Sequence, residues 1–341
     1  MPYDPSGPRA RVLLIGLGTT THSALESLAE RFEVVGLVRD GAAGDPTLIK
    51  AKALGVRVFG DTTMKGIDAL VTELRPDAVA VSSYHRILPA ELLAKSRFVN
   101  VHYAPLPKYR GRANVNWAVI NGESCTAISI HTMVPGLDAG RILYQELIPI
   151  RDTDTIVDLY DRLNAIQRRE LAAAVQRYLD GDPGAIQDER EATYGCTRTP
   201  DDGEINWSAS TLDVSRLVRA LVPPLPGAFT FHEGRRLVVW HAEPLADPPR
   251  YEGRVPGRVI GTSKKNGTVD VLTGDGVLRL FEVQRDGEAR TAAANVVRSV
   301  KDTLGLRTVD LFRRLAAVED RLAELERRAG RPEDKDRKSV V

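Results

Sequence analysis

The sequence predicts an α/β fold, in which a Rossmann-like parallel sheet is followed by a smaller β-rich domain and a C-terminal helix. Apolar runs alternate with helical patterns from Arg11 to Leu179, which is typical of parallel strands joined by crossover helices. After Tyr194 come many short strands at close spacing, which is typical of a small barrel. Between Leu311 and Ala329 the apolar residues alternate at spacings of four and three, as in a coiled coil.

The composition is that of a soluble globular protein: 341 residues, 43% hydrophobic and 27% charged, which is enough for two domains. The formal net charge of +1 gives no overall attraction to nucleic acid or to a membrane. The first residues, Met1-Pro2-Tyr3-Asp4, lack the basic and apolar regions of a signal peptide, and no apolar run approaches the roughly 20 residues of a membrane helix. Cys125 and Cys196 are far apart and form no CxxC pair. We therefore expect a cytoplasmic protein with two reduced thiols.

The elements of the first half follow from apolar runs and from apolar residues at helical spacing. The expected strands are 11–16, 32–38, 56–59, 78–81, 98–102, 126–133 and 142–150. The expected helices are 22–31, 46–54, 67–74 and 154–179, and the sequence Gly-Asp-Pro-Gly at 181–184 marks the end of this half.

The second half begins with a turn, 199–203, that is expected to lead into a short strand over 204–207. A helix over 210–221 and strands over 226–231, 236–240, 257–260, 268–272 and 276–283 are expected to follow. In the C-terminal helix, charged residues lie off the apolar seam, which predicts that two subunits join here as a homodimer. A helix that packs on its own domain is the alternative.

The first strand is followed by Gly16-Leu17-Gly18, which is only a weak sign of dinucleotide binding. The fingerprint needs a third glycine for close helix packing, and Thr21 stands in its place. A loop that lines the phosphate or sugar of a substrate is the better interpretation. NAD binding remains a minor alternative.

Three polar side chains in the central stretch form a candidate catalytic group. Asn100 and His102 alternate with valines on one strand, so both point to the same face. They lie at the C-terminal end of the strand, where open α/β sheets bind ligands, and Asp138 lies in a glycine-flanked loop. Together the three can stabilise an oxyanion, transfer a proton and orient the transferring group. A structural histidine and a turn aspartate are the alternative interpretation.

Three separated blocks occur in an order that resembles a known family. Asn100-x-His102, then Leu-Pro-Lys-Tyr-Arg-Gly at 106–111, then Leu-Asp-Ala-Gly at 137–140 resemble the signature of the 10-formyltetrahydrofolate-dependent formyltransferases. This family includes methionyl-tRNA, glycinamide ribonucleotide and amino-sugar formyltransferases. Arg198–Gly203 and Pro226–Phe229 resemble the C-terminal domain of methionyl-tRNA and amino-arabinose formyltransferases, which is OB-like.

The resemblance implies transfer of a formyl group from 10-formyltetrahydrofolate to an amine. It assigns Asn100 a hydrogen bond to the tetrahedral oxyanion and His102 oxyanion stabilisation and proton transfer. It assigns Asp138 the orientation of His102 and help in removing a proton from the amine. The reaction needs no metal, and no His/Cys cluster in the sequence suggests one.

The resemblance also implies a folate pocket near the fourth strand. The loop from Tyr84 to Leu88 matches the family's pteridine-binding loop, which assigns cofactor binding to Arg86, Ile87 and Leu88, with Asp138 beside them. The alternative is a connecting loop whose isoleucine and leucine pack below the sheet.

The residues after the histidine bear on the acceptor. The region from Pro107 to Glu123 looks most like UDP-4-amino-4-deoxy-L-arabinose formyltransferase, which assigns substrate binding to Lys108, Tyr109, Arg110 and Arg112. Their cations can pair with a sugar nucleotide's diphosphate. Ordinary surface cations are the alternative. Relatives carry Gly-Ser-Leu-Leu-Pro after the histidine, whereas this chain has Tyr-Ala-Pro-Leu-Pro at 103–107, which adds an aromatic side chain beside the site.

The sequence thus predicts an N-formyltransferase that acts on an amino sugar nucleotide or a related small biosynthetic amine. A methionyl-tRNA formyltransferase is the alternative, although residues 194–254 mix both charges without the basic run that RNA binding favours. A non-catalytic nucleotide-binding module is a lesser alternative. The predicted parts are a catalytic domain (1–182), a linker (183–193), an OB-like domain (194–306), a coiled-coil helix (307–330) and a disordered tail (331–341).

Overall fold

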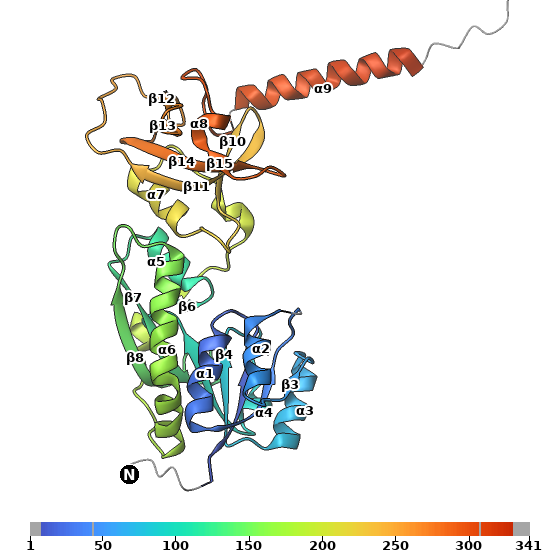
Figure 1. Cartoon of the computed structure of the whole chain (residues 1–341), viewed down its shortest axis with the longest axis vertical. Helices are drawn as coiled ribbons and strands as arrows, with labels where there is room; N and C mark the ends of the chain where they lie inside the picture. The colour runs from blue at the N-terminus through green and yellow to red at the C-terminus, as the bar shows by residue number, and fades with distance from the viewer. Residues whose placement is uncertain (1–7, 43, 307, 330–341) are drawn as a thin grey trace, which may run out of the picture. The chain divides into compact units, whose positions relative to one another are not determined.

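The structure is a computed structural model that describes residues 8–42, 44–306 and 308–329. The chain folds into two compact units (Figure 1). The first runs to Asp202 and also takes in Arg219–Pro224, and the second contains Gly203–Val218 and the chain from Leu225 onward. The predicted disordered tail, 331–341, lies outside the described residues.

The first unit is built on a sheet in the order β3-β2-β1-β4-β5-β7-β8. Its strands are β1 (Arg11–Ile15), β2 (Glu33–Val38), β3 (Val58–Phe59), β4 (Ala78–Ser82), β5 (Arg97–His102), β7 (Cys125–Thr132) and β8 (Ile142–Pro149). The five strands from β3 to β5 are parallel, which confirms the predicted Rossmann-like sheet. β7 and β8 run antiparallel to their neighbours because a direct hairpin joins them, with no crossover helix between.

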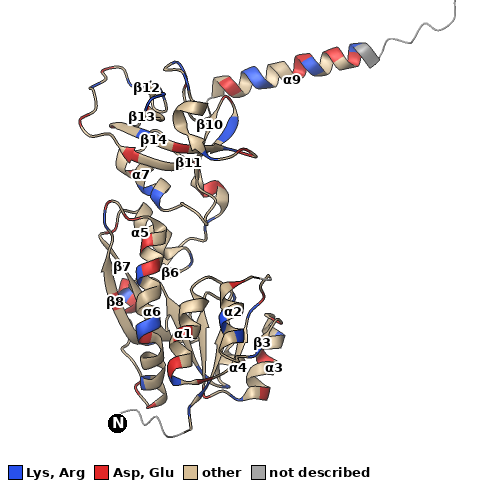
Figure 2. Cartoon of the chain, viewed as in Figure 1, with Lys and Arg blue, Asp and Glu red and all other residues tan. Residues whose placement is uncertain are grey.

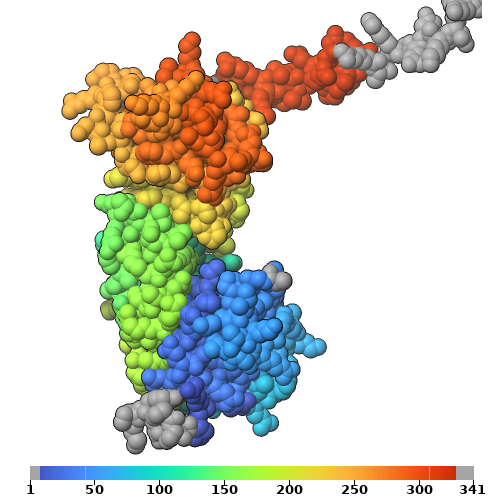
Figure 3. Space-filling model, in the orientation of Figure 1, coloured from blue at the N-terminus to red at the C-terminus, as the bar shows by residue number. Residues whose placement is uncertain are grey.

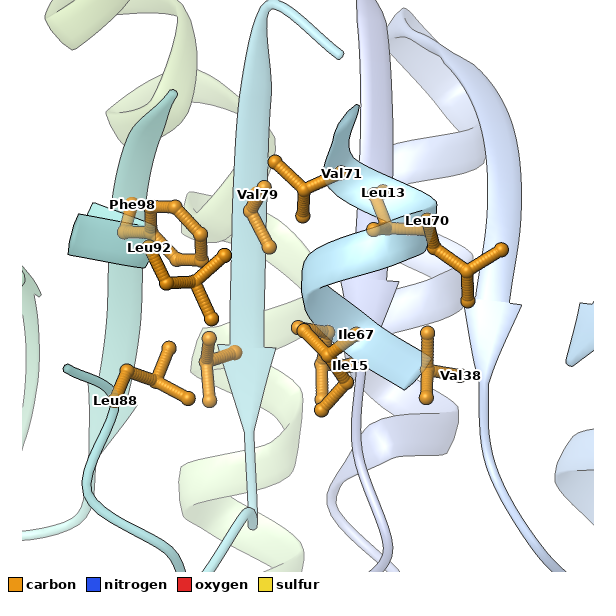
Figure 4. Close-up of a cluster of buried hydrophobic side chains, with 11 residues drawn as sticks. Leu13, Ile15, Val38, Ile67, Leu70, Val71, Val79, Leu88, Leu92 and Phe98 are labelled. Carbon is orange, nitrogen blue, oxygen red and sulfur yellow. The ribbon is translucent and has the colours of Figure 1, made fainter. Parts of the chain in front are cut away.

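Helices cover both faces of this sheet. They are α1 (Thr21–Arg31), α2 (Pro46–Ala53), α3 (Met64–Leu74), α4 (Ala90–Leu93), α5 (Asn114–Ile120) and α6 (Ile156–Leu179). α1 and α6 lie side by side over one face (Figures 1 and 3). On the other face, Ile67, Leu70 and Val71 of α3 pack onto the sheet. Figure 4 shows these side chains above Leu13 and Val79 of the two central strands.

The central strands are apolar throughout because both of their faces are covered. β1 and β4 contain almost no exposed residue, and their apolar runs were therefore the clearest strand predictions. The strand order reverses between β1 and β4, so the carboxyl ends of β1, β4 and β5 open onto the crevice where such sheets bind ligands.

The last part of the first unit contacts the segment that follows β5. β9 (Tyr194–Gly195) pairs in parallel with the short β6 (Arg110–Gly111), and two 3-10 helices, Glu189–Glu191 and Pro200–Gly203, flank it. The first unit thus includes β9 and continues to Asp202, with Arg219–Pro224 added. The predicted domain bounds remain a prediction.

The second unit holds an antiparallel sheet in the order β10-β11-β14-β13-β12, with β15 paired to β14. Its strands are β10 (Ala228–His232), β11 (Arg235–Pro244), β12 (Val259–Ser263), β13 (Thr268–Leu272), β14 (Val277–Arg285) and β15 (Thr291–Ala292), with helices α7 (Thr211–Arg219) and α8 (Ala293–Val296). The expected strand over 204–207 is reduced to one bridge, between Glu204 and Phe229, because Trp207 is buried with its indole N–H on Thr230. A closed OB-like barrel stays a prediction.

The chain continues into α9 (Thr308–Ala329), which carries charges of both signs along its length (Figure 2). Its apolar side chains are exposed. Among the described residues, no helix is both long enough and apolar enough to cross a membrane.

Candidate functional site

Asn100 and His102 lie at the carboxyl end of β5, on the same face of the sheet as the core residue Phe98. Asp138 lies in the loop between β7 and β8. β7 is antiparallel to β5 and ends opposite Val99, so the loop starts near the beginning of β5 and folds back to bring Asp138 beside Asn100 and His102. The three residues predicted from the sequence therefore do come together.

The Asp138 carboxylate is at the centre of this group. Its Oδ1 lies 3.4 Å from Asn100 Nδ2, and its Oδ2 lies 3.6 Å from His102 Nδ1. The backbone N–H of Gly111 donates a 2.9 Å hydrogen bond to Oδ2. An amide, an imidazole and a carboxylate thus face one another at the position expected of a ligand site.

The backbone around this carboxylate is unusual. Asp138, Tyr109 and Ala113 have positive φ angles of 48°, 57° and 58°. Non-glycine residues in this conformation cost roughly 1 kcal/mol or more each and cluster at functional sites. Gly140 allows the loop to close, since a Cβ there would lie 1.7 Å from the Thr132 carbonyl oxygen. The constrained backbone favours a functional interpretation over an ordinary turn.

A second histidine, His131 on β7, belongs to the group and was not predicted. Its Nε2 lies 3.1 Å from Asn100 Nδ2 and 3.6 Å from Asp138 Oδ1. Its Nδ1 lies 2.8 Å from the Thr132 carbonyl, which can only accept, so Nδ1 carries the hydrogen. Nε2 is then free to accept from Asn100. Burial lowers the pKa of His131 to about 4, although Asp138 opposes this shift, so the ring is neutral at pH 7.

His102 is buried and held through its other nitrogen. Its Nε2 lies 2.8 Å from the Tyr109 carbonyl and 3.0 Å from Asn114 Nδ2, a second residue that sequence reasoning missed. Because a carbonyl cannot donate, Nε2 carries a hydrogen. The nitrogen that can exchange a proton is therefore Nδ1, on the side of Asp138.

Arg110 does not lie where a phosphate ligand would. Its side chain is 2% exposed, and it donates to Glu189 at 2.7 and 2.8 Å and to Gln187 Oε1 at 2.8 and 3.3 Å. Gln187 Nε2 in turn donates to the carbonyls of Asp138 and Gly140, at 2.7 and 2.6 Å. The arginine thus anchors the Asp138 loop through Gln187, and no nearby sequence position indicated this role.

The other three predicted substrate residues, Lys108, Tyr109 and Arg112, are at least partly exposed, unlike Arg110. Lys108 and Arg112 are exposed. The Tyr109 hydroxyl donates to Glu123 at 2.5 Å and accepts from Asn121 at 3.1 Å. Lys108 and Arg112 are therefore available to a ligand as cations, whereas Tyr109 contributes its backbone to His102.

The predicted folate loop follows β4. Arg86 and Ile87 are exposed, Ile87 to 71%, whereas Leu88 is 2% exposed and belongs to the apolar core shown in Figure 4. The side chains that can reach a ligand are those of Arg86 and Ile87. Leu88 anchors the loop and leaves its backbone for contact.

The loop after β1 is closed by a buried ion pair. Arg39 donates to the carbonyls of Gly16 and Gly18 at 3.1 and 3.0 Å and pairs with Asp45 at 2.7 Å. A Cβ on Gly16 would clash with Thr21 and with the Ser82 carbonyl. An arginine after the second strand occupies the place where an NAD site needs a carboxylate. This geometry disfavours the minor dinucleotide alternative.

Tyr103 does not add an aromatic side chain to the site, which corrects that expectation. Its hydroxyl lies 2.8 Å from Asn164 Oδ1 and 2.6 Å from Gln167 Oε1 of α6, either of which can accept its hydrogen, and burial raises the pKa of Tyr103. Side chains alternate along a strand, so the residue after His102 points to the opposite face, toward α6. No group of three His, Cys, Asp or Glu side chains in the described ranges could hold a metal ion.

Two family descriptions match the chain: "Formyl transferase" over residues 30–175 and "Formyl transferase, C-terminal domain" over residues 198–301. A methionyl-tRNA formyltransferase from Alkaliphilus oremlandii is 34% identical over 250 residues, which are 72% of this chain and 79% of that protein. One from Caldanaerobacter subterraneus is 34% identical over 243 residues, 69% of this chain and 76% of that protein.

Solved structures share the fold. HypX from Aquifex aeolicus has a TM-score of 0.63 at 18% identity, over 86% of this chain and 49% of that chain, so this chain spans about half of HypX. A second HypX structure, with 18% identity, a TM-score of 0.63 and 86% of this chain matched to 47% of that one, holds tetrahydrofolic acid. A sugar N-formyltransferase from Shewanella has a TM-score of 0.54 at 20% identity, over 67% of this chain and 95% of that chain.

Proposed function

The chain belongs to the formyl transferase family, and on that premise we propose that it moves the formyl group of 10-formyltetrahydrofolate to a primary amine. The observation that supports this most directly is the convergence of Asn100 and His102 on the Asp138 carboxylate, at 3.4 and 3.6 Å. The amine nitrogen attacks the formyl carbon, the bond from that carbon to folate N10 breaks, and one proton passes from the amine to N10.

Asn100 supplies the hydrogen bond to the tetrahedral oxyanion. One hydrogen of its amide is held by neutral His131 Nε2 at 3.1 Å. The other makes only a 3.4 Å contact with Asp138 and can exchange it for a shorter bond to the oxyanion. His131 thereby fixes the amide with its N–H groups toward the site.

His102 and Asp138 transfer the proton that leaves the attacking amine. His102 Nδ1 faces the Asp138 carboxylate across 3.6 Å, so the carboxylate can orient the ring for proton transfer at Nδ1. Asp138 also accepts from the attacking amine, directly or through water. Arg86, Ile87 and the backbone of Leu88 would hold the folate, and Asp138 would contact it from the catalytic group.

Charged initiator tRNA is the first candidate acceptor, which reverses the preference derived from the sequence. Two methionyl-tRNA formyltransferases match at 34% identity over about seven tenths of the chain, whereas the sugar enzymes share only the fold. Pairing of Arg110 with Glu189 also removes one of the three cations expected to bind a diphosphate.

An amino sugar nucleotide is the second candidate. The resemblance around Lys108 and Asn116 favours it, and Lys108 and Arg112 remain exposed. The mixed charges of residues 194–254 also favour a small acceptor over RNA.

A competition assay tests the reaction and the acceptor together. The protein is given 10-formyltetrahydrofolate with methionyl-tRNA or with a panel of amino sugar nucleotides, and formyl transfer is followed by mass spectrometry. Formylation of tRNA that weakens steeply with salt supports the first candidate. Preferential formylation of a sugar supports the second. No transfer to any amine by a folded, folate-binding protein would refute the proposed reaction.

Three further proposals concern the localisation, the second domain and the oligomeric state. We propose a cytoplasmic enzyme with an OB-like C-terminal domain. We also propose that it works as a homodimer.

A further inference from the structure

We propose that α9 pairs in parallel with α9 of a second copy of this chain, forming a two-stranded coiled coil. Its apolar side chains have no cover: Leu315, Val318 and Leu322 are 53%, 64% and 56% exposed. In α6, by contrast, Leu159, Leu163 and Leu171 are fully buried. A helix of 22 residues with an exposed apolar stripe is far from stable alone in water, so a partner must cover the stripe.

The spacing of the stripe indicates another helix as the partner. Leu311, Leu315, Val318, Leu322 and Leu325 follow one another at alternating spacings of four and three. This places Leu315 and Leu322 at a positions and the other three at d positions of a heptad. A repeat of 3.5 residues is shorter than the helical turn, so the stripe stays on one side only if two helices wind around each other. A helix that packs against a globular domain does not require a repeat of 3.5 residues.

The charges beside the stripe identify the partner as an identical helix and set its direction. Arg314 and Arg321 fall at g positions, and Glu319 and Glu326 fall at e positions. In a parallel pair, each g residue faces the e residue of the next heptad in the other helix. Arg314 then faces Glu319 of the second copy, and Arg321 faces Glu326, and each pair occurs twice.

An antiparallel pair would bring g against g and e against e. It would therefore place Arg314 and Arg321 near arginines and Glu319 and Glu326 near glutamates, which is repulsive.

Existing contacts do not compete with this arrangement. Arg321 pairs with Glu324 of its own helix at 3.0 Å, and Arg314 donates one hydrogen bond to the Gly234 carbonyl. Each guanidinium has five N–H donors, so both can also reach a glutamate of the second copy. Acidic and basic residues are mixed along the length of α9, as Figure 2 shows, so the helix is poorly suited to RNA.

A charge-swap experiment in the full-length protein tests the pairing. In one variant Arg314 and Arg321 both become Glu, and in the other Glu319 and Glu326 both become Arg. Each variant alone places like charges opposite one another, so we expect its dimer dissociation constant to rise by about tenfold or more in light scattering or sedimentation. Mixing the two variants should restore a dimer, because the charges become complementary again.

A matched control changes the same charges on the outer face. Arg313→Glu with Arg327→Glu alters f positions, so the dimer should keep its wild-type dissociation constant. Circular dichroism of the control variant checks that it keeps the helix content of the wild type. A wild-type protein that stays monomeric at every concentration would overturn the proposal, as would two swap variants that do not recover when mixed.

Single cysteines determine the direction. In a background with Cys125→Ser and Cys196→Ser, both thiols that could compete are gone. Leu315→Cys and Leu325→Cys lie at an a and a d position, which face each other when two such helices run antiparallel. In a parallel pair each cysteine meets its own equivalent, so each variant should form a disulfide-linked dimer by itself. Cross-linking only when the two variants are mixed would show an antiparallel pair and refute the proposed direction.

Discussion

Gln187 is expected to control activity although it lies outside the group of reacting side chains. It joins Arg110 to the loop that carries Asp138, through two hydrogen bonds given and two received. Gln187→Leu removes all four. Gln187→Glu keeps an acceptor for Arg110 but turns the donor into a carboxylate oxygen that repels the two carbonyls. The pair of variants therefore separates support of the arginine from placement of Asp138.

The expected magnitudes follow from these contacts. Gln187→Leu leaves the carbonyls of Asp138 and Gly140 without their donor, while Arg110 keeps Glu189. Each of the two losses costs about 1–3 kcal/mol, so the free energy of unfolding should fall by about 2–6 kcal/mol. A domain of ordinary stability survives this loss at 25 °C. If the carboxylate moves by about 1 Å, turnover falls by roughly 10²-fold. Both variants should show this decrease in kcat, with KM for the folate little changed.

The assay is steady-state formyl transfer with the best acceptor found, beside urea unfolding of each variant. Ile67→Ala is the control, because Ile67 lies in the apolar core of Figure 4 and makes none of the hydrogen bonds that hold the Asp138 loop. Its cavity should cost about 2–5 kcal/mol while kcat stays near wild type. Wild-type kcat in folded Gln187→Glu would refute the inference that these carbonyl contacts place the carboxylate.

Three further predictions concern the site. His102→Ala should lower turnover by roughly 10² to 10⁴ without unfolding the protein, as measured by steady-state kinetics, and an active variant would remove His102 from the mechanism. Buried His131 stays neutral in the folded state, with its pKa lowered from 6.5 to about 4, whereas the unfolded chain takes up a proton below 6.5. The free energy of unfolding should therefore decrease as the pH is lowered from 6.5 to about 4. This decrease should be larger in wild type than in His131→Gln, by at most about 3 kcal/mol. Equal pH slopes of the two proteins in urea unfolding would contradict the assignment. Calorimetry should detect binding of a reduced folate analogue and none of NAD, because Arg39 closes the Gly16–Gly18 loop, and tight NAD binding without folate binding would reverse this conclusion.

Local pattern was sufficient for much of the fold. Buried parallel strands are apolar along their whole length, so β1 and β4 could be predicted to within a residue or two. Alternation along β5 placed Asn100 and His102 on one face, since successive side chains of any strand point to opposite sides. The heptad repeat of α9 is also a local property, because consecutive residues of one helix are enough to define it.

Partners that are distant in sequence were decided only by the tertiary structure. Asn100 and His131 meet because they are register partners on the antiparallel strands β5 and β7, and strand periodicity alone specifies no register. The sequence predicted Arg110 as a ligand of a diphosphate, with a surface cation as the alternative. In the fold it is paired with Gln187 and Glu189, which lie 77 and 79 residues away in the sequence. A motif shows which residue types are present, but burial and long-range partners decide whether a charge binds a ligand or holds the loop that does.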